Sequence, residues 1–112
     1  MPILISSKDY QQITAQNSMP VVIEFYATWC SKCMMMEAIY NRVATKLKDY
    51  FNFYKIDVDT AATLIKELGI EIYPTFIVYQ KGNIIGYTSG VLSELTLHER
   101  LLEMVSSPKK GL

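Results

Sequence analysis

Residues 21–27, VVIEFYA, form a nearly continuous run of apolar, β-branched and aromatic side chains interrupted by one charged residue, Glu24. Such a run is typical of a strand buried on both faces, as in a sheet covered by helices on either side. From residue 31 to residue 50, apolar side chains then recur at helical spacing, at Met36, Ile39, Val43 and Leu47. A buried strand followed by a long helix favours the α/β class of folds.

The remaining elements continue this alternation of strands and helices. Before the strand at 21–27 we expect a strand at 3–5 and a helix at 6–17 capped by Ser6 or Ser7. After the helix at 31–50 we expect a strand at 51–58 and a short helix capped by Thr60 and ending at Gly69. The chain then continues with a hairpin of 75–80 and 83–89 around Lys81-Gly82 and a last helix capped by Ser93. The order β-α-β-α-β-α-β-β-α implies a mixed central sheet with helices on both faces.

Size and charge narrow the class of protein. The 112 residues suit one compact domain, residues 1–112, and half of them are hydrophobic. The formal net charge is zero and no basic stripe is visible, which argues against a nucleic-acid partner. No apolar run is long enough for a membrane span, and the first ten residues, MPILISSKDY, lack the features of a signal peptide. We therefore expect a cytoplasmic protein.

The chain holds two cysteines, Cys30 and Cys33, which is too few for a disulfide scaffold. They lie between the predicted strand and the long helix, where unpaired amide groups and the helix dipole stabilise a thiolate. The spacing places Cys33 one helical turn after Cys30. Cys30, at the helix start, would be the exposed nucleophile that attacks a substrate disulfide, and Cys33 would resolve the mixed disulfide.

A metal half-site is the alternative interpretation of this pair. A structural zinc ion needs four ligands, and the only histidine, His98, falls in the last predicted helix. One chain cannot complete such a site, so metal binding would require a dimer that shares the ion or cluster. A C-x-x-C motif within a βαβ pattern favours redox chemistry instead, with no metal.

At this point the sequence resembles the thioredoxin family. The resemblance rests on four segments in the family's order and spacing: VVIEFYATWCSKC, YKIDVD, YPTFIVYQKG and SGVLS. It covers about residues 3–106 and leaves a short C-terminal tail. It implies a thioredoxin fold and thiol–disulfide exchange by a redox-active Cys30–Cys33 disulfide, without a bound cofactor.

The resemblance also implies roles for residues around the cysteines. Trp29 would shield the disulfide and contact substrate proteins, and Pro74 matches the family's cis-proline, across from the cysteines. Tyr73 would present its backbone to an extended substrate segment, while Gly90 and Val91 match a loop that completes the apolar rim. For Trp29, Tyr73 and Val91, the alternative to a role in substrate binding is an ordinary packing role.

Glu24 is the one charged residue in a strand that should be buried, and burial of a carboxylate raises its pKa. It matches a buried acid of the family that helps to move the proton of the resolving thiol, and Lys55 matches a lysine near that acid. We hypothesise that Glu24 takes the proton from Cys33, directly or through water. The alternative is a glutamate that reaches solvent or pairs structurally with Lys55.

Ser31 and Lys32 replace the Gly-Pro that is usual between the family's cysteines. The replacement removes the rigidity of proline, and Lys32 places a cation beside the Cys30 thiolate, which stabilises it. We predict a mildly more oxidising couple than the family's reducing members. The alternative for Lys32 is a plain solvent-facing side chain.

The leading functional prediction is a monomeric oxidoreductase that reduces disulfide-containing substrate proteins with electrons from a thioredoxin reductase or a similar donor. A second possibility is a more oxidising, isomerase-like protein, which the absence of a signal peptide disfavours. The third is an adaptor module with the same fold and little catalysis. Both cysteines, Pro74 and a buried acid together weaken the adaptor interpretation.

Overall fold

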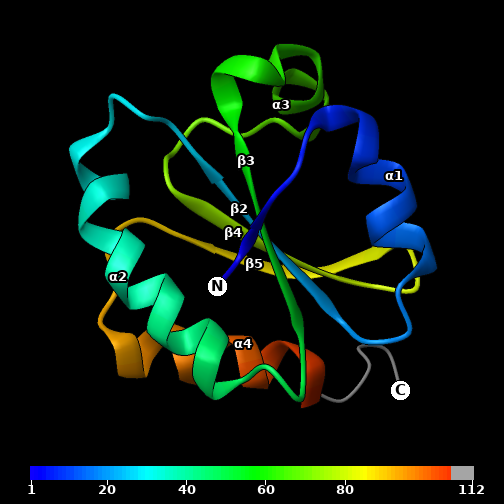
Figure 1. Ribbon diagram of the computed structural model, residues 1–112, viewed down its shortest axis with the longest axis vertical. Coiled ribbons are helices and arrows are strands. Elements are labelled where there is room, and N and C mark those ends of the chain that lie inside the picture. The colour runs from blue at the N-terminus through cyan, green and yellow to red at the C-terminus, as the bar shows by residue number, and fades with distance from the viewer. Residues whose placement is uncertain (107–112) are drawn as a thin grey trace.

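The computed structural model describes residues 1–106, and the predicted tail at 107–112 lies outside them. Five strands form one sheet in the order β1-β3-β2-β4-β5 (Figure 1). Their bounds are Ile3–Leu4 for β1, Val21–Tyr26 for β2, Asn52–Asp57 for β3, Thr75–Gln80 for β4 and Asn83–Ser89 for β5. The first three are mutually parallel, whereas β4 is antiparallel to both β2 and β5. The predicted mixed sheet is therefore confirmed.

Helices cover both faces of the sheet, as predicted. They span Ser7–Gln16 for α1, Ser31–Lys46 for α2, Ala62–Leu68 for α3 and Glu94–Ser106 for α4. Figure 1 shows α2 and α4 on one face and α1 and α3 on the other. Within residues 1–106, no helix is long and apolar enough to cross a membrane.

The central strand β2 supplies side chains to two separate apolar cores. Val22 packs with α2 and α4 residues such as Met36 and Leu97. Ile23 and Phe25 belong to the second core, on the face of α1 and α3. Because successive strand residues point to opposite faces, Glu24 lies on the same face as Val22, and only 4% of it is exposed. Burial on both faces explains the continuous apolar run of β2.

Two predicted helix boundaries are wrong. The short helix begins at Ala62, not after a Thr60 cap, because Val58–Thr60 form a 3₁₀ turn in which the Thr60 hydroxyl donates to the Asp57 carbonyl. Helix α2 ends at Lys46 rather than at residue 50. There the chain turns, and the amide of Phe51 donates to the carbonyl of Leu47.

The caps of the first and last helices agree with the sequence. Ser6 precedes α1, and its backbone N–H and hydroxyl both donate to the carboxylate of Asp9. The hydroxyl of Ser93 accepts the amide of Thr96 at 3.1 Å, which satisfies a free donor in the first turn of α4.

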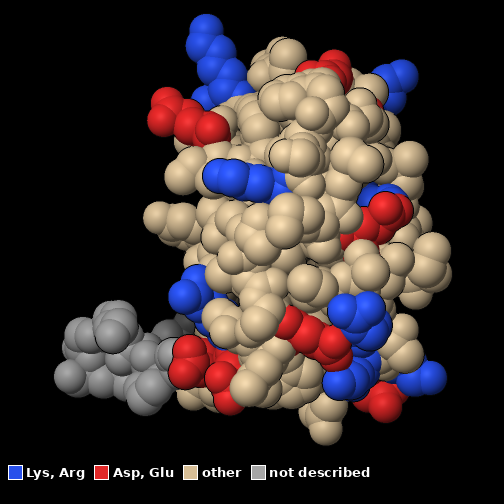
Figure 2. All heavy atoms as spheres, turned by 90° about the vertical axis from the view of Figure 1, so that its left-hand side faces the viewer, with Lys and Arg blue, Asp and Glu red and all other residues tan. Residues whose placement is uncertain are grey.

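Helix α4 is also tied to α2 by charge. The carboxylate of Glu94 pairs with both Arg42 and Lys46, each at 2.7 Å. On the face seen in Figure 2, which includes α2, positive and negative side chains are interspersed. This face therefore carries no continuous patch of one sign.

Candidate functional site

The two cysteines lie at the start of α2, where the chain leaves β2. Cys30 is the N-cap residue, and its sulfur accepts the amide N–H of Cys33 at an N···S distance of 3.3 Å. Both are free thiols; Cys30 is partly exposed, whereas Cys33 is 5% exposed. An amide donor and the positive end of a sixteen-residue helix both stabilise a thiolate at Cys30.

Cys33 has the opposite environment. Burial, together with the hydrogen bond and charge of Cys30, raises the pKa of the Cys33 thiol to about 12. At neutral pH this thiol is therefore protonated, and it can attack only after a base has removed its proton. The two sulfurs are chemically distinct although they are three residues apart.

The loop before β4 and the loop after β5 meet beside Cys30. The Tyr73–Pro74 bond is cis, and the Cys30 thiol lies 3.8 Å from the carbonyl oxygen of Tyr73. The Gly90 amide donates to the Pro74 carbonyl at 2.9 Å, with Gly90 at φ 87°. The next residue, Val91, is 45% exposed. Tyr73 and Pro74 are thus brought beside Cys30, with Gly90 bonded to Pro74 and Val91 following it in the chain.

Trp29 stands at the rim of the site with 67% of its surface exposed, so it is not an ordinary core residue. Its indole N–H donates to a carboxylate oxygen of Asp59 at 2.8 Å. Its ring meets the ring of Tyr73 edge-on, at 6.1 Å between centroids and 85° between planes. The indole of Trp29 is therefore held by a hydrogen bond to Asp59 and by an edge-on contact with the ring of Tyr73.

Asp59 is a site residue that the sequence analysis missed. It lies in the 3₁₀ turn directly after β3, and its own amide donates to the Asp57 carboxylate. The available signal was its place after the carboxyl end of a strand parallel to β2, since such ends meet at one edge of the sheet.

Beneath the cysteines, Glu24 and Cys33 line the same cavity of about 250 Å³. Its other lining residues are Tyr26, Ala27, Thr28, Met34, Glu37 and Lys55. The cavity is lined by both polar and apolar side chains and is large enough for water, and its carboxyl, ammonium and hydroxyl groups can serve as the two to four polar partners that a buried water needs. The cavity therefore offers a path between the buried carboxyl and the resolving thiol.

The electrostatics of Glu24 suit proton exchange at neutral pH. Burial raises the pKa of its carboxyl to about 7, against the attraction of Lys55, which lowers it; the charge of Glu37 raises it further. Lys55 faces Glu24 across the β2–β3 pair, and its ammonium lies 5.5 Å from the centroid of the Tyr26 ring. Among the described residues, no Glu24–Lys55 ion pair forms within 4.0 Å.

Ser31 and Lys32 are both exposed in the first turn of α2, between the cysteines. Among residues 1–106, no group of three or more histidine, cysteine, aspartate or glutamate side chains is placed to hold a metal ion.

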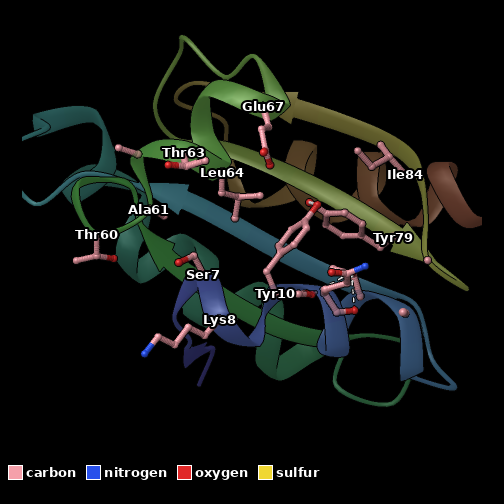
Figure 3. Close-up of a pocket in the computed structure, with 15 residues that line it drawn as sticks. Ser7, Lys8, Tyr10, Thr60, Ala61, Thr63, Leu64, Glu67, Tyr79 and Ile84 are labelled. Atoms are coloured by element: carbon pink, nitrogen blue, oxygen red, sulfur yellow. Dashed lines mark hydrogen bonds between the residues drawn. The ribbon is translucent and has the colours of Figure 1, made fainter.

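A larger cavity, of about 630 Å³, lies between α1 and α3 on the other face of the sheet (Figure 3). The hydroxyls of Tyr10 and Tyr79 meet there at 2.8 Å, and Ser7, Leu64 and Glu67 also contribute to its lining. Neither cysteine lines it, so it is separate from the redox site.

Comparison with known proteins gives one consistent family. A family model described as Thioredoxin matches residues 2–103. The chain is 37% identical over 89 residues to a thioredoxin of Malassezia sympodialis, covering 78% of this chain and 84% of that protein. It is 35% identical over 92 residues to Thioredoxin Y2, chloroplastic, of Arabidopsis thaliana, covering 82% of this chain but 55% of that protein. The chain thus spans about half the length of the Arabidopsis relative.

The solved structures agree. The crystal structure of the Malassezia sympodialis thioredoxin superimposes with a TM-score of 0.83 at 30% sequence identity, covering 95% of this chain and 92% of that one. Nearly the whole described chain therefore shares one fold with that protein.

Proposed function

This chain belongs to the thioredoxin family, and from that premise we propose that it reduces disulfide bonds in other proteins through Cys30 and Cys33. The observation that carries the proposal is the contrast between the two sulfurs. Cys30 is partly exposed and accepts an amide hydrogen bond at a helix start, whereas Cys33 is buried and protonated. One sulfur is therefore suited to attack and the other to resolve.

The reaction proceeds in two exchanges. The Cys30 thiolate attacks one sulfur of the substrate disulfide, which forms a mixed disulfide and releases the first substrate thiolate. Glu24 then takes the proton of the Cys33 thiol through water in their shared cavity. The Cys33 thiolate attacks the sulfur of Cys30, so the Cys30–Cys33 disulfide forms and the second substrate thiolate leaves. Glu24 ends protonated, and two electrons have passed from the protein to the substrate.

The substrate segment lies against the rim of Trp29, Tyr73, Pro74, Gly90 and Val91. The rim is apolar and partly exposed, and its backbone is held beside Cys30 by the Gly90–Pro74 hydrogen bond. An extended peptide bound there pairs with backbone groups, which gives affinity without demanding one side-chain sequence. Lys32 stabilises the Cys30 thiolate from the exposed first turn of α2.

We infer one domain that acts as a monomer, with a thioredoxin reductase or a similar donor returning the disulfide to two thiols. Family membership supports this choice of donor. The relatives include one named chloroplastic, so a cytoplasmic location stays a prediction.

Reduction of insulin disulfides by dithiothreitol tests the proposal. We expect the native chain to accelerate it and Cys30→Ser to abolish the acceleration. Cys33→Ser should instead trap substrate proteins on Cys30 as mixed disulfides. A native chain that shows no activity dependent on Cys30 would favour the adaptor interpretation.

Replacement of Glu24 by Gln tests the proton relay separately. The step that resolves the mixed disulfide should become slower near neutral pH and lose its dependence on the ionisation of Glu24. A pH profile identical to that of the native chain would rule out the relay while leaving the roles of the cysteines intact.

A further inference from the structure

The cavity that joins Glu24 to Cys33 has a second carboxylate at its edge. Glu37 lies on α2, four residues after Cys33, and lines the same cavity. Residues at this spacing lie on the same face of a helix. Unlike Glu24, Glu37 is exposed, so its charge is stabilised by solvent while the residue still lines the cavity that the buried carboxyl lines.

Two opposite charges on different elements thus share the cavity of Glu24. Lys55 lies opposite it on β3, and Glu37 lines the cavity from α2. The other titratable side chains around it are Tyr26 on its own strand, and Cys33 and Tyr40 on α2. None of these three carries a charge at neutral pH in the reduced protein, because burial raises the pKa of each.

We propose that Glu37 is a positioning residue for the resolving step, whose carboxylate opposes Lys55 and keeps Glu24 able both to bind and to release a proton near neutral pH. Glu37 touches no reacting sulfur in this role and acts only through Glu24. The proposal deepens the proposed function, since it rests on Glu24 as the base for Cys33.

Burial is the largest cause of the raised pKa of Glu24, and the two charges adjust that pKa in opposite directions. The cation of Lys55 favours the ionised form of Glu24, and the anion of Glu37 favours the protonated form. Removing Glu37 would leave burial alone to oppose Lys55, so Glu24 would stay ionised to lower pH and become a weaker base. Removing Lys55 would have the opposite effect and keep Glu24 protonated to higher pH.

The first test measures the titration of the Glu24 carboxyl carbon by NMR in the reduced full chain. Glu37→Gln should lower the titration midpoint by about 0.2–0.7 pH units, the range expected for an exposed charge pair. Lys55→Met should raise the midpoint. Glu99→Gln, which removes an equally exposed carboxylate from α4, is the matched control and should leave it unchanged.

The second test follows the pH dependence of resolution of a mixed disulfide, formed on Cys30 with a small aromatic disulfide. Its midpoint should move to lower pH in Glu37→Gln, together with the Glu24 titration. A Glu24 midpoint that is unmoved, or moves as much in Glu99→Gln, overturns the proposal. A Glu24 titration midpoint that moves in Glu37→Gln while the pH profile of the resolution rate stays the same also overturns the proposal.

Failure of the relay itself is recognised independently. If Glu24→Gln leaves the rate profile unchanged, the base assignment is wrong, whatever Glu37 does. If Glu24→Gln changes the rate profile but Glu37→Gln does not, the relay stands and Glu37 has no part in it.

Discussion

The indole nitrogen of Trp29 lies 2.8 Å from a carboxylate oxygen of Asp59, although the two residues are thirty positions apart. This hydrogen bond joins the start of the cysteine motif to the turn that follows β3. It helps to orient a side chain that is mostly exposed and otherwise contacts the ring of Tyr73. Asp59 therefore positions the indole of Trp29.

We predict that Asp59→Ala will weaken substrate binding more than chemistry. A single exposed hydrogen bond contributes about 0.5–1.5 kcal/mol, so KM should rise about 2- to 10-fold with kcat nearly unchanged. Tryptophan fluorescence should show a more mobile indole. Asp49→Ala, at an exposed aspartate just after α2, is the control and should change neither quantity. A large loss of kcat would contradict a purely positioning role.

Glu24 should make the fold less stable as the pH rises. Its pKa is about 7 in the folded chain, against 4.5 as the ordinary value, so the folded state binds more protons between these two pH values. Stability from this group is full below pH 4.5 and is lost as the pH rises through 7, a change of about 3 kcal/mol.

The matching experiment is urea unfolding of the native chain and Glu24→Gln from pH 4 to pH 8. The stability of the variant relative to the native chain should increase across this range. A difference that stays constant with pH would mean that Glu24 titrates alike in both states.

The two thiols should differ strongly in alkylation. Because burial and Cys30 raise the pKa of Cys33 to about 12, its thiolate fraction at pH 8 is about 10⁻⁴. We predict that limited iodoacetamide labels Cys30 first and Cys33 more than about 100-fold more slowly. Peptide mapping by mass spectrometry measures both rates, and comparable labelling would contradict the assigned roles.

Much of the site could be predicted from the sequence because its parts are local or carried by the family resemblance. The alternation of patterns predicted the α/β class, and the thioredoxin family and fold implied by the resemblance are confirmed. The Ser93 cap was visible because it depends on neighbouring residues alone.

Contacts between segments far apart in the sequence were harder to predict from the sequence. Nothing in the local pattern paired Asp59 with Trp29, since that contact depends on how the end of β3 meets the start of α2. Thr60 has the chemistry of a helix cap, but the Asp57 carbonyl accepts its hydroxyl instead. Glu37 resembled any exposed helical glutamate until the cavity placed it beside Glu24.

Gly90→Ala should impair the substrate rim. Gly90 has φ 87°, and an added methyl group would meet no atom within 4 Å, so the cost is backbone strain of about 1–2 kcal/mol. Gly69→Ala is a matched control, with φ 70° and equal space, because Gly69 ends α3 and takes no part in the Gly90–Pro74 hydrogen bond. Both should lower the unfolding free energy, measured in urea, while only Gly90→Ala raises KM. Equal effects on KM would show that the loop has no role in binding.

Lys32 should tune the redox couple only slightly. An exposed cation stabilises the reduced thiolate by about 0.5–1 kcal/mol, which corresponds to about 10–20 mV. We predict that Lys32→Gln lowers the reduction potential by this amount in a glutathione titration. Lys48→Gln, at an exposed lysine beyond the far end of α2, should leave it unchanged. A rise in potential, or a shift several times larger, would contradict a simple charge effect.

The alternation of side chains along β2 links folding to reactivity. Val22 and Glu24 face α2, whereas Ile23 and Phe25 face the opposite core. A slip of one residue in strand pairing would turn Glu24 toward that second core and away from Cys33. A misregistered chain would retain both cysteines but lose the carboxyl that shares a cavity with Cys33. Pairing errors in this strand would therefore be detected as slow turnover as well as reduced stability.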